Sequence, residues 1–187
     1  MSDERTPDDR ARDDRAPERA GEAREPASST PAREPASPAT PSPEWAGDSP
    51  GAHEFFDVEA DVGVHAWGPT RADAFARAAE GMLALGVTPS AVAPNETREA
   101  RAQGASLEAL LVNWLNECLY VHEIEGFAVA RVEVDTCRDD FIHGVLHGEV
   151  LDPGRHPLGT IVKAATHHQV DVREIPGRVD VRVVVDI

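Results

Sequence analysis

Closely spaced carboxylates mark the first place in this chain where chemistry could occur. In the run Asp57-Val-Glu-Ala-Asp61-Val-Gly63, acidic residues recur at every second position between two stretches with strand character. Carboxylate oxygens that converge in a turn suit hard cations such as Ca²⁺ or Mg²⁺. Spacing alone fits a solvated acidic turn as well, so both interpretations stay open at this stage.

The end of the chain offers a second set of oxygens. The sequence stops at Asp186-Ile187, directly after the alternating segment Val179–Asp186. Most domains end in a few loose polar residues. An end flush with a strand would hold the side-chain carboxylate of Asp186 and the terminal carboxylate of Ile187 close together, as a cation-binding pair. A trimmed terminus is the alternative interpretation.

The run Gly148–Pro157 predicts a functional loop. Asp152-Pro-Gly is a turn signal, and it brings Asp152, Arg155 and His156 into one loop after a strand. Loops on a rigid sheet commonly carry functional residues. A purely structural histidine beside an aspartate remains the alternative.

Lys163 is the only lysine in the chain, and the other seventeen basic residues are all arginine. A larger, forked guanidinium could not replace a compact ammonium in a tight site, so we expect a functional role, with chance retention as the competing explanation. Thr166 follows on the same stretch, together with His167 and His168. Neighbouring residues in a strand point to opposite faces, so these two histidines are not expected to bind one metal ion.

Two helices are predicted to hold these residues in place. Thr70 is an N-cap signal with Asp73 three positions later, and the helix that it starts ends at Gly86. Ser106 caps a second helix, whose apolar residues recur at helical spacing and which Gly126 closes.

Strand patterns account for most of the remaining residues. In Val179–Asp186 the odd-numbered valines should face the core, with Asp186 on the opposite face. The segment 91–102 is expected to be extended and partly exposed. The other strands are expected at His53–Val58, Val62–Trp67, Phe127–Cys137, Phe141–Leu151, Val162–Ala165 and Gln169–Arg173. Together these elements predict an α+β fold over residues 53–187, a single compact domain in which a mixed β-sheet is packed by two main helices.

Residues 1–50 have a different composition. They hold nine of the fifteen prolines, and Trp45 is their only large hydrophobic side chain besides Met1. Such a stretch cannot bury enough apolar surface to offset its ordering entropy, so a disordered tail is predicted. Its 12 acidic and 7 basic residues give a net charge of −5, which leaves −11 of the total of −16 on the rest of the chain. The domain is therefore acidic in its own right.

The charge argues against direct nucleic-acid binding. Asp and Glu outnumber Lys and Arg by 34 to 18, whereas phosphate backbones are bound by Lys and Arg. An acidic chain suits a basic protein partner or divalent cations, and solubility alone is the other explanation. We expect a cytoplasmic protein without membrane contact, because the sequence shows neither a secretory signal nor a membrane-spanning apolar run. Cys118 and Cys137 form no disulfide or metal pattern.

Taken in order, these pieces resemble the archease family over residues 53–187. Each motif alone is weak, but the ordered set is specific. It comprises Ala60-Asp61-Val-Gly63, Ala66-Trp-Gly68, the helix with Ala79 through Met82, Leu110 through Glu117, Gly148-Glu149 with Asp152 and His156, Val162-Lys-Ala164 with Thr166 and His168, and the final Asp186-Ile187.

The resemblance implies an accessory protein, not an enzyme. Archeases are cofactor proteins of RtcB-type RNA ligases, whose guanylylation and multiple turnover they promote in tRNA splicing or RNA repair. The resemblance also implies a bound divalent cation, calcium in the first place and magnesium or manganese as alternatives. Its ligands would be Asp61, Asp186 and Ile187. The functional surface would comprise Lys163, Asp152, His156 and Thr166.

The chain departs from the family pattern at one point of the first motif. The family has a histidine three residues before the aspartate, where this chain has Val58, followed by Glu59. Three other functions stay open: a modulator or chaperone of a tRNA methyltransferase, a small metal-dependent hydrolase using the same carboxylates, and a purely structural acidic domain. No GxGxxG, GxxxxGK[ST], GxSxG or HExxH motif points to an enzyme class.

Overall fold

The computed structural model describes residues 51–58 and 61–187 of the chain. The tail predicted for residues 1–50 lies outside these ranges, and so does Glu59. The elements run in the order β1-β2-α1-η1-β3-α2-β4-β5-β6-β7. None of the described helices is long and apolar enough to cross a membrane.

Helix α1 spans Arg71–Ala84 and begins with a complete capping box. The Thr70 hydroxyl accepts the backbone N–H of Asp73, and the Asp73 carboxylate accepts the backbone N–H of Thr70. Two of the donors that a helix start leaves unpaired are thereby satisfied. The predicted start is confirmed, and Phe75 and Met82 are fully buried on the face that packs into the core.

Helix α2 spans Leu107–Glu123 and begins at Ser106, whose hydroxyl accepts the backbone N–H of Ala109. Its apolar stripe is buried, and Trp114 at its centre is fully buried with its indole N–H donating to the Phe75 carbonyl of α1 at 3.2 Å. Gly126 follows with a φ of 64°, a conformation that a side chain would strain. The second predicted helix and both of its limits are confirmed.

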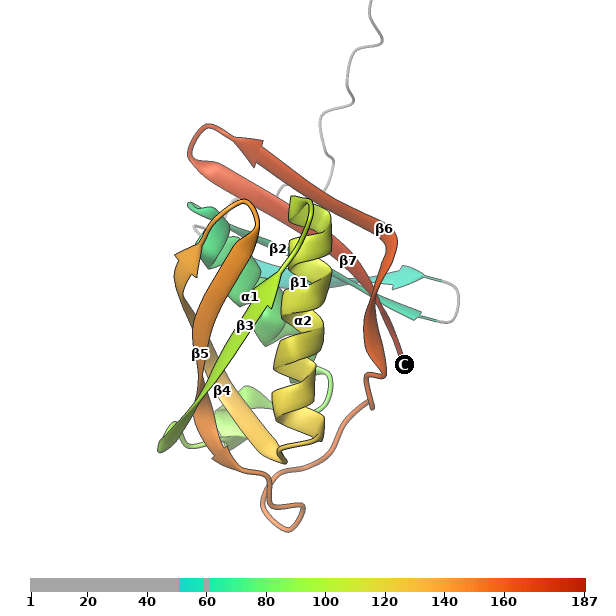
Figure 1. Ribbon diagram of the computed structural model, residues 1–187. Helices are drawn as coiled ribbons and strands as arrows, with labels where there is room; N and C mark the ends of the chain where they lie inside the picture. The colour runs from blue at the N-terminus through green and yellow to red at the C-terminus, as the bar shows by residue number, and fades with distance from the viewer. Residues whose placement is uncertain (1–50, 59–60) are drawn as a thin grey trace, which may run out of the picture. The chain divides into compact units, whose positions relative to one another are not determined.

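Over the described ranges, seven strands form two separate sheets. The four-stranded sheet has the order β1-β2-β7-β6, and the three-stranded sheet has the order β3-β5-β4. Each helix contacts both sheets, α1 through β2 and β4 and α2 through β3 and β6 (Figure 1). The strands are β1 Ala52–Val58, β2 Asp61–Gly68, β3 Glu96–Gln103, β4 Phe127–Cys137, β5 Phe141–Val150, β6 Ala164–Ile175 and β7 Arg178–Asp186, and the short 3-10 helix η1 spans Pro89–Ala91.

The α+β class with two main helices is confirmed, and the sheet differs from the single mixed sheet that was expected. All neighbouring strands pair antiparallel. Short turns join β4 to β5 and β6 to β7, and short turns permit only antiparallel pairing. Helix α1 carries the chain from β2 in one sheet to β3 in the other, so it does not act as a crossover between parallel neighbours.

The last two strands position the end of the chain. The odd-numbered valines of β7 are buried in the core, as the alternation predicts. Strand β6 is one element where two segments were predicted, because its pairing with β7 is only interrupted between Thr166 and Asp171. Gln169 lies in this interruption with a φ of 53°, which is uncommon for a residue with a side chain.

Candidate functional site

The start of β2, the end of β7 and the start of β6 meet at one end of the four-stranded sheet, and we call this end the sheet edge. Val62 pairs with Val185, and Ala164 pairs with Asp186. Continuing the first register by one residue places Asp61 opposite Asp186. Side chains of directly opposed residues lie on one face of an antiparallel pair, with Cβ atoms about 5 Å apart. The register therefore brings two of the predicted cation ligands side by side.

These two carboxylates are not paired with another side chain within the described part of the chain. No hydrogen bond or ion pair joins the side chain of Asp61 or Asp186 to another residue of the ranges 51–58 and 61–187. Asp180, on the same strand β7, instead pairs with Arg178 at 2.7 Å. Neighbouring like charges repel, and a bound cation is one way to stabilise such a pair.

Lys163 ties the end of β7 to the segment before β6. Its backbone N–H donates to the Asp186 carbonyl at 2.8 Å, and its Nζ donates to the main-chain oxygen of Ile187 at 2.6 Å. A compact ammonium can make this contact end-on, whereas a guanidinium presents a wider, planar fork. The lone lysine thus lies at the same sheet edge as the predicted cation ligands.

Asn116 on α2 fixes this edge from behind, and no role was predicted for it. Its Oδ1 accepts the backbone N–H of Ala165 at 2.9 Å, and its Nδ2 donates to the Ala165 carbonyl at 3.1 Å. Ala165 is almost fully buried, so these bonds satisfy two main-chain groups that water cannot readily reach. The signal in the sequence is an amide, with both a donor and an acceptor, beside the apolar stripe of a helix.

The Thr166 hydroxyl is engaged within the sheet. Its Oγ1 donates to the Val184 carbonyl at 3.0 Å and accepts the backbone N–H of His168 at 3.3 Å. These bonds support the irregular part of β6, where His167 and His168 are exposed. Thr166 therefore shapes the strand three residues after Lys163, and a direct contact with a partner stays a prediction.

His156 does not lie on the exposed surface, contrary to the prediction, because its side chain is completely buried. Its Nδ1 accepts the backbone N–H of Asp152 at 3.0 Å, so Nε2 carries the proton and donates to Glu149 at 3.1 Å. The Asp152 carboxylate is exposed and accepts the backbone N–H of Gly154 at 2.9 Å. Figure 1 shows this loop, after β5, at the bottom of the view and away from the end of β7.

Glu149 is the centre of that loop. One of its oxygens accepts the backbone N–H of Ala93 at 2.8 Å, Arg155 at 2.6 Å and the Nε2–H of His156. The bond from Ala93 and then the guanidinium of Arg155 lower the pKa of Glu149 to about 2. Arg155 and His156 therefore hold the loop through Glu149, and of the three predicted loop residues only His156 is buried, whereas Asp152 and Arg155 are exposed.

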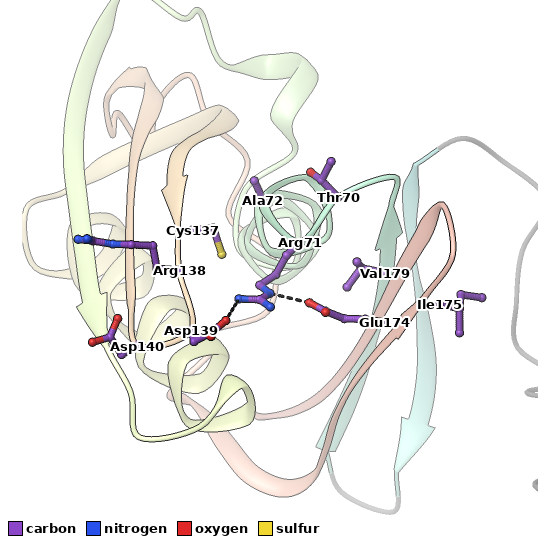
Figure 2. Close-up of a pocket in the computed structure, with 10 residues that line it drawn as sticks. All are labelled: Thr70, Arg71, Ala72, Cys137, Arg138, Asp139, Asp140, Glu174, Ile175 and Val179. Carbon is purple, nitrogen blue, oxygen red and sulfur yellow. Dashed lines mark hydrogen bonds and ion pairs between the residues drawn. The ribbon is translucent and has the colours of Figure 1, made fainter.

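A large hollow on the described surface is lined by none of the predicted site residues. It has a volume of about 820 Å³ and lies between the first turn of α1, the β4–β5 turn and the β6–β7 hairpin (Figure 2). Arg71 crosses it and donates to Asp139 at 2.8 Å and to Glu174 at 2.6 Å. The bond to Glu174, followed by that to Asp139, raises the pKa of Arg71 above its usual value. The ion pairs of Arg71 in this hollow thus link β6 of one sheet to the β4–β5 turn of the other.

A cation at the sheet edge remains a prediction. Among residues 51–58 and 61–187, no three His, Cys, Asp or Glu side chains converge as a metal-binding group. The predicted set contains only two side chains of these types, Asp61 and Asp186, and takes its third oxygen from Ile187. Such an all-oxygen set fits a hard cation that completes its shell with water or with a partner's groups.

Comparison with known proteins gives one consistent result. Residues 53–187 match the family described as Archease protein family (MTH1598/TM1083). The chain is 37% identical over 137 residues to the protein archease of Methanopyrus kandleri, an alignment that covers 72% of this chain and 98% of that relative. It is 34% identical over 142 residues to the protein archease of Pyrobaculum neutrophilum, with coverages of 74% and 97%.

Two solved structures are similar to the fold. The solution structure of Methanobacterium thermoautotrophicum protein 1598 superposes with a TM-score of 0.61 at 29% identity and covers 73% of this chain and 99% of that one. The crystal structure of an archease from Thermotoga maritima, described as a possible chaperone, superposes with a TM-score of 0.50 and covers 72% and 96%. The second is 16% identical, so that likeness concerns the fold alone.

Proposed function

Because this chain belongs to the archease family, we propose that it is an accessory protein that activates an RtcB-type RNA ligase in tRNA splicing or RNA repair. In this role it promotes guanylylation of the ligase and repeated turnover, and supplies no catalytic residue of its own. The observation that carries the proposal is the sheet edge. There, Asp61 and Asp186 lie side by side and Lys163 contacts Ile187.

The proposed edge holds a divalent cation, calcium in the first place. The carboxylates of Asp61 and Asp186 and the main-chain oxygen of Ile187 are its ligands. Val58 of β1 pairs with Asp61 of β2, and it stands at the position where the family pattern has histidine. A valine cannot ligate, so the site keeps only oxygen ligands, which favours calcium or magnesium over softer metals.

Lys163 adds a positive charge beside the carboxylates of the same edge. Its ammonium already contacts the Ile187 main-chain oxygen at 2.6 Å, so it is held next to the proposed cation site. When this edge enters the active site of the ligase, the cation and the ammonium are placed to attract nucleotide phosphates or to orient the ligase nucleophile. The acidic charge of the domain suits approach to a basic ligase surface.

Asp61→Ala and Lys163→Ala test this function directly. With purified ligase, GTP and a nicked RNA substrate, the wild-type chain should increase ligase guanylylation and multiple-turnover ligation, and both variants should lose this stimulation. Asp57→Ala is the matched control, since Asp57 is an exposed carboxylate on the same hairpin that lies outside the proposed set. Unfolding curves of all variants report that the fold is kept.

Two outcomes would overturn the proposal. Full stimulation by both variants would remove the sheet edge from the mechanism. Turnover of GTP or RNA by this chain without ligase would make it an enzyme of the hydrolase type. The archease structure from Thermotoga maritima is described as a possible chaperone. Measuring the activity of a tRNA methyltransferase with and without this chain tests that alternative role.

A further inference from the structure

Large hydrophobic side chains are exposed around Lys163. Tyr120 is 50% exposed, and Ile124 and Ile161 are each 70% exposed. Tyr120 and Ile124 line one hollow with Lys163, and Ile161 lies two residues before it in the chain. Ile187, whose main chain contacts the Lys163 ammonium, is 37% exposed. Exposed apolar groups that gather beside charged ones are typical of a protein-binding surface.

The hollow is a groove between the second half of α2 and Lys163, and we call it the α2 groove. It has a volume of about 200 Å³. The residues that line it are Asn116, Leu119, Tyr120, Glu123, Ile124 and Lys163.

Hydrogen bonds hold the main chain beside the α2 groove. Asn116, which lines the groove, makes two bonds to the main chain of Ala165 through its side-chain amide. The segment that leads to Lys163 is held as well, since the backbone N–H of Thr160 donates to the Leu85 carbonyl at 2.8 Å. Because these walls are held in the free protein, a partner side chain can enter without ordering the groove first, which favours tight binding.

The charges around the α2 groove define what can occupy it. Of the residues that line it, Glu123 is acidic and Lys163 is basic, and Glu117 on the same helix and Asp186 at the neighbouring sheet edge add negative charge. An apolar floor with an acidic rim fits a segment that carries one bulky apolar side chain flanked by arginine or lysine.

We propose that the α2 groove docks a basic, amphipathic segment of the ligase partner, and that this contact supplies most of the affinity of the complex. The inference rests on the proposed function and adds a division of labour to it. Burial of Tyr120, Ile124 and Ile161 holds the partner, whereas the charged edge with Asp61 and Lys163 acts on its active site. Apolar anchors in pockets dominate binding energy, while exposed charges at a rim contribute little to it.

The double variant Ile124→Ser/Ile161→Ser tests the docking site. Titrating it into the ligase should raise the concentration for half-maximal stimulation by at least roughly tenfold, while stimulation at saturation stays at the wild-type level. Asp61→Ala, at the charged edge and outside the groove, should do the opposite, losing stimulation at saturation with a nearly unchanged dissociation constant. Ile175→Ser is the matched control, because Ile175 is 50% exposed at the hairpin end of β6, and it should change neither quantity.

Charge reversal tests the chemistry of the partner segment. Glu123→Lys should weaken the complex by roughly tenfold, and tighter binding would overturn the inference that the docked segment is basic. If the double variant titrates like wild type while Asp61→Ala loses stimulation, the docking proposal fails and the proposed function stands. If wild type neither binds nor stimulates the ligase, both fail. If light scattering shows a wild-type dimer that the double variant dissociates, the groove instead binds a second copy of this chain.

Discussion

Replacing Asn116 with alanine removes the link between α2 and the start of β6. The variant loses a donor to the Ala165 carbonyl and an acceptor for the Ala165 N–H. Each such bond contributes about 1 kcal/mol net, and a buried group left unpaired costs about 1–3 kcal/mol. Ala165 is 4% exposed, so water replaces these bonds poorly. After roughly 0.5 kcal/mol is regained from the better helix propensity of alanine, we expect a loss of about 2 kcal/mol in the free energy of unfolding.

Asn113→Ala provides the control on the same helix. Asn113 is exposed and makes one bond, from its Nδ2 to the Gln103 carbonyl at 2.8 Å. Its loss should cost about 0.5 kcal/mol, which the same gain in helix propensity offsets. The two asparagine variants therefore share the change in helix propensity and differ in the bonds removed, one exposed bond to Gln103 against two buried bonds to Ala165.

Urea unfolding, followed by tryptophan fluorescence, measures the difference. The midpoint of Asn116→Ala should fall well below that of Asn113→Ala with an unchanged slope. Asn116→Asp keeps the acceptor for the Ala165 N–H and loses the donor, so its midpoint should not return to the wild-type value. Equal midpoints for the two alanine variants would refute the reasoning, because Asn116 would then not hold the start of β6 in solution.

Three further changes probe the frame around the site. Glu149→Gln should be less stable than wild type at pH 7. This difference in stability should shrink as pH falls from about 4.5 through about 2, since the carboxylate stabilises the fold only while it is ionised. Thermal unfolding across that pH window measures the difference, and a constant difference would contradict the prediction. Arg71→Met should cost roughly 1–2 kcal/mol, less in 1 M salt, because both carboxylate partners are solvent-exposed; a salt-independent loss in urea unfolding would argue against the ion pairs. Gly148→Ala should destabilise by about 3 kcal/mol or more, because its Cβ would overlap the Ala128 carbonyl of the paired strand; an unchanged melting temperature would disprove that close approach.

The sequence predicted the elements that depend on local signals. Both helix starts follow from Thr70 and Ser106, whose hydroxyls cap the neighbouring backbone N–H groups, and Gly126 ends α2 through its positive φ. The alternation of valines in β7 likewise reports its buried face. Strand pairing depends on residues far apart in the chain, so no local pattern could show that α1 leads from one sheet to the other.

The candidate site shows the same limit at the level of side chains. The resemblance implies that His156 belongs to the functional surface, but its partners are the Asp152 backbone N–H and the Glu149 carboxylate, which the fold of the loop brings together. No local pattern predicts the bonds of Asn116 to the start of β6, because its partner, Ala165, lies 49 residues away along the chain. The role of Asp61, Asp186 and Ile187 as cation ligands stays a prediction.

The balance of charge within the fold, and not the size of a hollow, points to the sheet edge. The hollow around Arg71 and the edge at Asp186 lie at opposite ends of β7, which is roughly 25 Å long. In the hollow, Arg71 already binds two carboxylates, so an incoming anion would have to displace one of them. At the edge, Asp61 and Asp186 are side by side, and no arginine, lysine or histidine side chain of the described ranges pairs with their carboxylates. Charge paired within the fold holds it together, whereas charge that the fold leaves unbalanced attracts a cation or a partner.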